Sequence, residues 1–143
     1  MNENKVILKI LGFAGSLPEL SKRLQLEPTK TALKGEDCSI GPAHQRVKRT
    51  YEWNYWEYRW TRTEERYIAD MVEEFIASIV EPRKETLKEL IAGCRAELSL
   101  VQYYYGCNPG FHFSQNALRT ISYIGAEIDV DIYCFDEDEQ ENA

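Results

Sequence analysis

Residues 126–134 read AEIDVDIYC, and apolar side chains alternate there with acidic or polar ones. Successive side chains of a β-strand point to opposite faces of its sheet, so a period of two predicts a strand that is covered on one face and wet on the other. Just upstream, Ser114 can cap a helix that runs to Ile124, and Gly125 suits the left-handed residue after the last helical turn. The stretch from 114 to 134 therefore predicts a helix followed closely by a half-exposed strand.

The residues before this helix predict a further strand over 96–105, and Asn108-Pro109-Gly110 supplies a strong turn between the two elements. In the helix, a buried line is predicted at Leu118, Ile121 and Ile124 because these side chains recur at helical spacing. The last third of the chain is therefore predicted to form a β-α-β unit.

The beginning of the chain has the same order of elements. Residues 5–13 are rich in Val, Ile and Leu, Ser16 and Glu19 match a helix capping box, and a short extended piece follows over 29–34. Two such units in one sheet predict an α+β fold, namely a two-layer α/β sandwich of ferredoxin-like type with a mostly antiparallel sheet and helices on one face. The repetition suggests an internal β-α-β duplication.

The middle of the chain is rich in aromatic residues. Over 46–60 they alternate with polar residues, and the phase of the alternation changes at Tyr55 and Trp56, as an extra residue in a β-bulge would cause. One long, bent strand is therefore predicted. Residues 36–45 contain few apolar side chains and a Gly-Pro pair, which predicts a loop.

The most regular helical pattern spans residues 67–80, where apolar side chains recur over four turns. Thr63 is the predicted cap of this helix. Pro82 should interrupt it, because proline lacks the N–H that the next turn requires, and a shorter helical arm is expected beyond.

Length and charge limit the classes of protein to consider. The chain has 143 residues and a net charge of −7, from 24 acidic and 17 basic side chains. This length suits one domain, placed at 1–135, and the acidic run over 136–143 is expected to be a disordered tail. The acidic balance opposes binding to nucleic acid. Polar residues at the start, and an apolar run broken by Lys9, do not match a signal peptide or membrane span, so a cytoplasmic protein without membrane contact is expected.

Three motifs resemble a known family. They are LEPTKT at 26–31, NPGFHFS at 108–114 and GAEIDVDIY at 125–133. They resemble the hallmarks of a bacterial family known only as a domain of unknown function, number four-two-seven-nine, and the resemblance spans nearly the whole chain. It implies a small bacterial cytosolic protein, and it brings no activity or catalytic residue to carry over.

The cysteine and histidine residues are the best candidates in the sequence for a reactive or metal-binding site. Cys38 with His44 and Cys107 with His112 offer suitable zinc ligands, but their gaps of five and four residues do not match compact zinc pairs. P-loop, dinucleotide-binding, zincin and nucleophile-elbow motifs are absent from the sequence. We therefore expect no enzymatic activity, no metal and no cofactor. His112 is predicted to orient the turn before the Ser114 helix.

Two groups of residues are candidates for binding. Segment 46–62 interleaves rings with basic side chains, which is the chemistry of single-strand recognition, although core packing is the ordinary role of strand aromatics. Asp129 and Asp131 lie two apart on one strand and share a face. Lys9 or Arg95 are their expected partners across the sheet.

The leading hypothesis is a small non-enzymatic binding protein that holds a protein partner against its open sheet face, as an immunity protein neutralises a basic toxin. The alternative is a ligand- or single-stranded nucleic-acid-binding module built on segment 46–62. A homodimer also stays open. The candidate binding residues are Trp53, Tyr55, Tyr58, Arg59, His112, Asp129 and Asp131.

Overall fold

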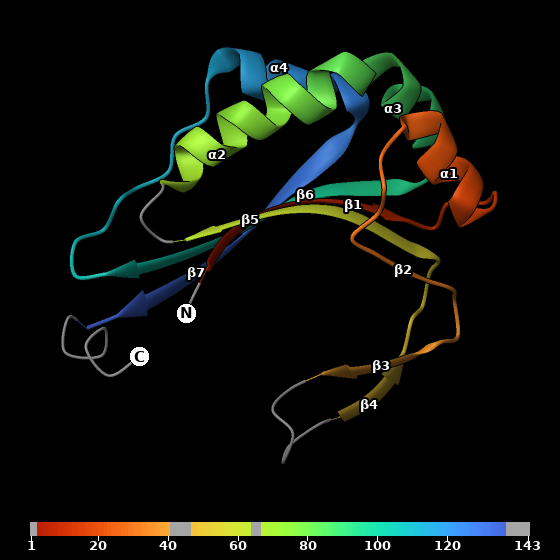
Figure 1. The fold of residues 1–143 in the computed structure, drawn as a ribbon, viewed down its shortest axis with the longest axis horizontal. Helices are drawn as coiled ribbons and strands as arrows, with labels where there is room; N and C mark the ends of the chain where they lie inside the picture. Colours follow the sequence, from red (N-terminus) through yellow and green to blue (C-terminus); the bar gives the residue numbers. More distant parts are fainter. Residues whose placement is uncertain (1–2, 41–46, 64–66, 137–143) are drawn as a thin grey trace.

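The structure of the chain is a computed structural model that describes residues 3–40, 47–63 and 67–136. Within these residues, one sheet has five strands in the order β2-β5-β1-β6-β7, and β3 and β4 form a separate hairpin. All neighbouring strands of the large sheet are antiparallel except β6 and β7. The helices lie on one face of the sheet and the hairpin lies on the other side (Figure 1). The predicted α+β sandwich with helices on one face is therefore confirmed.

Both predicted β-α-β units are present, but their strands are arranged differently. In the second unit the two strands are parallel neighbours. In the first unit both strands run antiparallel to β5, which lies between them, so this unit is split. The bounds are β1 (Glu3–Leu11), α1 (Leu17–Leu24) and β2 (Lys30–Ala32) for the first unit, and β6 (Arg95–Tyr105), α4 (Gln115–Ile124) and β7 (Ala126–Phe135) for the second.

Local capping groups explain where α1 and α4 begin. The hydroxyl of Ser16 accepts a hydrogen bond from the Glu19 backbone N–H (3.2 Å), and the hydroxyl of Ser114 accepts one from the Ala117 backbone N–H (3.0 Å). Gly125 ends α4 in the left-handed conformation with φ 81°, which glycine adopts without steric cost. The predicted capping residues of both helices are confirmed.

The predicted long strand over 46–60 is wrong, because this segment forms two strands of different sheets. β4 (Val47–Thr50) pairs with β3, while β5 (Tyr55–Thr63) pairs with β1 and β2. The break lies at residues 51–54, where the Asn54 side chain donates to the Phe13 carbonyl and accepts from the Lys34 backbone N–H. These contacts with distant loops end the strand pairing, and alternation of rings along the sequence cannot reveal them.

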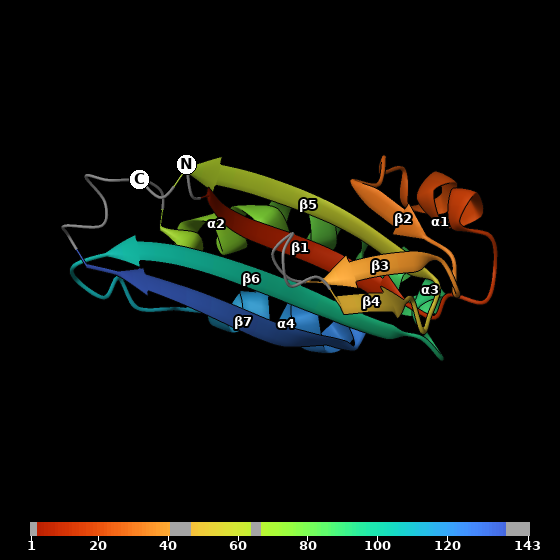
Figure 2. The same ribbon diagram turned by 90° about the horizontal axis from the view of Figure 1, so that it is seen from below.

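The loop predicted over 36–45 is also partly a strand. β3 (Asp37–Ile40) pairs antiparallel with β4, and Cys38 lies opposite Arg49. Residues 41–46 lie outside the described residues. The view from the side opposite the helices has this hairpin in front of β1 (Figure 2), so it overhangs the sheet face that the helices leave uncovered.

The helix predicted over 67–80 is present but changes its winding before Pro82. Thr63, the predicted cap, is the last residue of β5, and Tyr67 occupies the N-cap position without a side-chain hydrogen bond. Pro82 lies within a short 3₁₀ turn, which confirms the interruption. The bounds are α2 (Ile68–Phe75), a π-helical turn (Ile76–Val80), the 3₁₀ turn (Glu81–Arg83) and α3 (Lys84–Leu90).

Aromatic residues of β5 form part of the core between sheet and helices. The Trp56 side chain is fully buried, and its Nε1 donates to the Ser21 hydroxyl on α1 at 2.9 Å. Tyr58 and Trp60 pack against Phe75 of α2, with ring centroids 6.1 and 5.2 Å away. The rings of Trp56, Tyr58 and Trp60 therefore pack between the sheet and the helices.

Two of the three residues predicted for the buried line of α4, Ile121 and Ile124, are confirmed, and Leu118 is not. Leu118 is half exposed, and the buried side chains are Ala117, Thr120, Ile121 and Ile124. These four residues recur at helical spacing and form one buried stripe, and Leu118 lies outside that stripe. The small side chain of Ala117, and not the predicted Leu118, therefore packs against the rest of the fold.

Candidate functional site

The uncovered face of the sheet is built from odd-numbered residues. In β1, β5, β6 and β7, register pairs join odd positions to odd positions, and paired residues share a face. Even positions such as Leu8 and Leu98 are buried toward the helices, so the odd positions point the other way. We call the odd-numbered side chains of these four strands the open face, which is the side seen in Figure 2.

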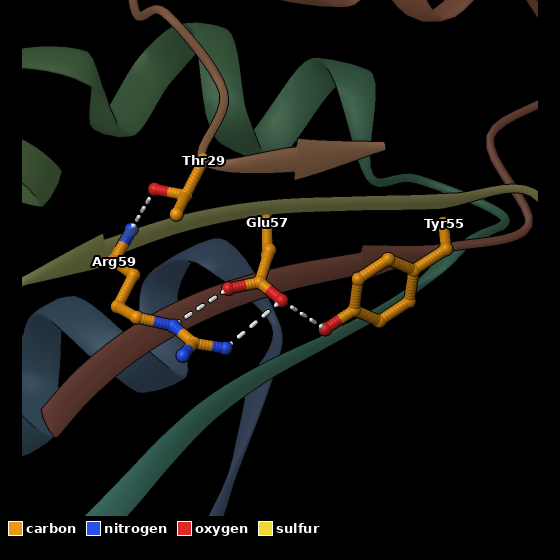
Figure 3. A network of polar contacts seen from close by, with 4 residues as sticks. All are labelled: Thr29, Tyr55, Glu57 and Arg59. Atoms are coloured by element: carbon orange, nitrogen blue, oxygen red, sulfur yellow. Dashed lines mark hydrogen bonds and ion pairs between the residues drawn. The ribbon is translucent and has the colours of Figure 1, made fainter. Parts of the chain in front are cut away.

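A buried carboxylate organises the β5 side of the open face (Figure 3). The Glu57 side chain is only 2% exposed, and it accepts hydrogen bonds from the Tyr55 hydroxyl (2.9 Å) and from Arg59 Nε (2.9 Å) and Nη2 (3.2 Å). Burial, reinforced by the negative charge of Glu57, raises the pKa of Tyr55. The network fixes the Arg59 guanidinium and neutralises its charge.

The candidates around β5 divide between the two faces. Tyr55 and Arg59 lie on the open face, where Glu57 brings them together. Tyr58 does not belong to this face, because it pairs with Leu8 and its ring lies against Phe75. The predicted change of phase at Tyr55 and Trp56 is confirmed, because Tyr58 points to the other side of β5 from Tyr55. The prediction that Tyr58 contacts a partner on the open face is wrong.

Trp53 does not lie on a strand. It is in the connection between β4 and β5, and its side chain is exposed. A Cβ atom at Gly12 would lie 3.4 Å from the Trp53 ring, so the indole sits beside the loop that follows β1. Trp53 is thus accessible beyond the end of the open face.

Accessible side chains of the open face gather on β7. Nearer the centre, Ile7, Glu57 and Ser99 are buried. On β7, in contrast, the open-face side chains Glu127, Asp129, Asp131 and Tyr133 are all exposed. The part of the open face that a partner could reach first is therefore its β7 side.

The charges on this side do not pair as expected from the sequence. Arg95 binds Glu127, with its Nη2 at 3.1 Å, and approaches Glu97 at 3.8 Å. The prediction that Arg95 would partner Asp129 or Asp131 is therefore wrong. Within the described residues, neither aspartate has a hydrogen bond or ion pair.

The open face is divided by charge along the order of its strands. Lys9, the other predicted partner of the aspartates, lies opposite Glu57 and Glu97, two strands away from β7. Lys5 lies on the same central strand, whereas Asp129 and Asp131 lie at the β7 border. The accessible border is therefore negative, and the cations lie toward the centre.

Stacked rings close one end of the open face, and sequence reasoning missed them. Tyr103 of β6 stacks on Tyr133 of β7 at 4.9 Å, and Tyr105 stacks on Phe135 at 5.3 Å. Burial raises the pKa of Tyr103, and the neighbouring Tyr133 adds to the shift. The available signal was that both strands end in aromatic residues, but their register is needed to stack them. We call these four residues the aromatic ladder.

Within the described residues, His112 makes no hydrogen bond or ion pair that would orient the turn before α4. It is exposed in the loop between β6 and α4. Instead, the Glu73 carboxylate of α2 accepts hydrogen bonds from both the backbone N–H and the hydroxyl of Ser114, each at 2.9 Å. The role predicted for His112 belongs to Glu73, which is distant in sequence and could not be paired with Ser114 from spacing.

The cysteine and histidine pairs do not form a site in the described part of the chain. Cys38 lies on the hairpin strand β3, and Cys107 is exposed after β6. His44 lies outside the described residues. Among residues 3–40, 47–63 and 67–136, no three His, Cys, Asp or Glu side chains are grouped closely enough to hold a metal ion.

A hollow of about 700 Å³ lies in the helix layer, between the α2–α3 segment and α4. The Glu81 carboxylate on its wall accepts from the Thr120 hydroxyl (2.6 Å) and from Lys84 Nζ (2.7 Å), and the Lys84 bond lowers the pKa of Glu81. These polar groups bond to one another and join the helices. The open face is therefore the stronger candidate site.

Fold and open face together define a small α+β sandwich domain whose sheet displays charged and aromatic side chains on the side away from its helices. The model of the family described as Domain of unknown function (DUF4279) matches residues 2–135, so the chain belongs to this family. Neither the curated proteins nor the solved structures include a significant match to it. In the described residues, no helix has the length and apolar character needed to cross a membrane.

Proposed function

We propose that this protein is a non-enzymatic binding protein of the cytoplasm that holds a basic protein partner against the β7 side of its open face. The observation that carries the proposal is the pair Asp129 and Asp131, which is exposed and has no partner within the described residues, beside the aromatic ladder. Aromatic residues are enriched at protein interfaces and attract Lys and Arg through their ring faces. The unpaired cysteines agree with a reducing compartment.

An immunity-type role, in which the partner is a basic toxin, is the specific form of this proposal. The net charge of −7 would attract a basic protein over distance and speed the encounter. The negative border of the open face would then set the orientation. Such a protein needs a contact surface and no reaction pocket.

The alternative, a single-stranded nucleic-acid-binding module on segment 46–62, has less support. Three rings of this segment pack on the core side of β5 and are not displayed for stacking with bases, namely Trp56, Tyr58 and Trp60. The aromatic ladder could stack bases, but Asp129 and Asp131 next to it would repel phosphates.

The test is capture of partners from the native host by three tagged proteins, followed by quantitative mass spectrometry. These are the wild type, the variant Asp129→Lys/Asp131→Lys and the control variant Glu27→Lys/Asp70→Lys. The control changes net charge equally at two exposed positions outside the open face. We expect a stoichiometric basic partner with the wild type and the control and its loss from the Asp129→Lys/Asp131→Lys variant. A partner that the open-face variant retains, or no stoichiometric partner at all, would overturn the proposal.

A further inference from the structure

We propose that the outer edge of β7 accepts an added β-strand from the basic partner, a strand in which Lys or Arg alternates with apolar residues. This inference rests on the proposed function and names the element of the partner that would bind. It follows from three properties of β7, which are a backbone side that pairs with no described strand, two unlike faces, and carboxylates that oppose a second copy in the central registers.

One side of the β7 backbone pairs with no strand in the described part of the chain. β7 is the last strand in the sheet order and pairs only with β6 among the described residues. On an edge strand, every second residue directs its N–H and C=O groups outward, where another strand can bind them. β7 spans ten residues, longer than the typical strand, and it contains neither the proline nor the lysine that often protects an edge.

The two faces of β7 call for different side chains in the added strand. Toward the helix side, Val130 and Ile132 remain 38% and 51% exposed, so apolar surface is left uncovered there. Toward the open face, Asp129 and Asp131 offer two carboxylates that no other described residue binds. Side chains of an added strand alternate between the same two faces. Apolar residues would therefore lie beside Val130 and Ile132, and cations beside the aspartates.

Charge disfavours pairing of a second copy of this chain with the middle of the β7 edge. Antiparallel self-pairing centred on Asp129, Val130 or Asp131 would set carboxylates opposite carboxylates, and like charges directly opposite each other destabilise a strand pair. The same carboxylates attract a basic strand. In these central registers charge therefore favours a basic partner over a second copy.

The inference can be tested with synthetic peptides. The probes are a seven-residue peptide alternating Lys with Val, the same peptide with Glu in place of Lys, and a peptide of the first composition with its Lys and Val in separate blocks. Binding is measured by fluorescence titration, and amide protection by hydrogen exchange with mass spectrometry. We expect the alternating Lys peptide to slow exchange in β7 and to bind about tenfold more tightly than either control peptide.

Two variants separate strand addition from general attraction. In Asp129→Lys/Asp131→Lys the preference between the Lys and Glu peptides should reverse. In Val130→Ser/Ile132→Ser the charge is unchanged, yet affinity for the alternating Lys peptide should fall about tenfold because the apolar contact is lost.

Equal binding of the alternating and block peptides, or protection outside β7, would overturn strand addition. Protection of β7 that rises with protein concentration and needs no peptide would also overturn it, because a second copy would then occupy the edge. If the cellular partner depends on Asp129 and Asp131 but no peptide protects β7, strand addition fails while the proposed function stands. If no cellular partner depends on Asp129 and Asp131 and no peptide protects β7, both strand addition and the proposed function fail.

Discussion

Substitution of Glu57 by alanine removes a buried carboxylate from the open face. The carboxylate accepts three hydrogen bonds, one from Tyr55 and two from Arg59, and its side chain is 2% exposed. In Glu57→Ala the Tyr55 hydroxyl loses its acceptor, and the Arg59 guanidinium loses its counter-charge. We expect a large loss of stability from this one change.

The size of the loss follows from burial. Removing one partner of a fully buried ion pair costs about 3–5 kcal/mol, because the other charge is left without compensation. Arg59 remains 31% exposed, so water can replace part of the lost contact, which favours the lower end of that range. We therefore expect Glu57→Ala to lower the free energy of unfolding by about 3 kcal/mol and Tm by about 10 °C.

The assay is urea and thermal unfolding of the wild type, Glu57→Ala and the matched control Glu127→Ala. Glu127 also binds an arginine, Arg95, but its side chain is 62% exposed. An exposed ion pair contributes below about 1 kcal/mol, so the control should stay close to the wild type. If Glu57→Ala cost no more than Glu127→Ala, the buried network would not stabilise the fold and the reasoning would be refuted.

Three further predictions concern other contacts. The raised pKa of Tyr55 means that its stabilising contribution is full below about pH 10 and is lost as pH rises further, so Tyr55→Phe should lose stability less steeply than the wild type in unfolding titrations at alkaline pH. Glu73→Ala should cost about 2 kcal/mol in urea unfolding, because Ser114 loses both of its hydrogen bonds to the Glu73 carboxylate and keeps only its capping bond within α4. In urea unfolding, Ile121→Ser should lower the free energy of unfolding by more than about 2 kcal/mol and Leu118→Ser by less than about 0.5 kcal/mol. Equal losses would contradict the burial of Ile121 and the exposure of Leu118 on α4.

Elements with local signals could be predicted from the sequence. The hydroxyls of Ser16 and Ser114 cap helices through bonds to residues three positions on, so the interaction lies within one short window. The alternation over 126–134 likewise placed Asp129 and Asp131 together on the open face. In each case the deciding contact or periodicity lies within a few neighbouring residues.

Features that depend on distant contacts could not be predicted. The break between β4 and β5 depends on Asn54 bonding to loops on other parts of the chain. The aromatic ladder depends on the register of β6 and β7, and the turn before α4 depends on Glu73. Glu57 looks like an ordinary wet-face residue between two rings, and only the arrangement of Tyr55 and Arg59 around it makes it a buried acceptor.

The footprint of the captured partner tests the role of the open face most directly. Hydrogen exchange with mass spectrometry would compare the free protein with the purified complex, following peptides from β6 and β7 and from the helix layer separately. We predict slower exchange in β6 and β7, with α2 and α4 unchanged. Protection confined to the helix layer, where the Glu81 hollow lies, would contradict a binding role for the open face.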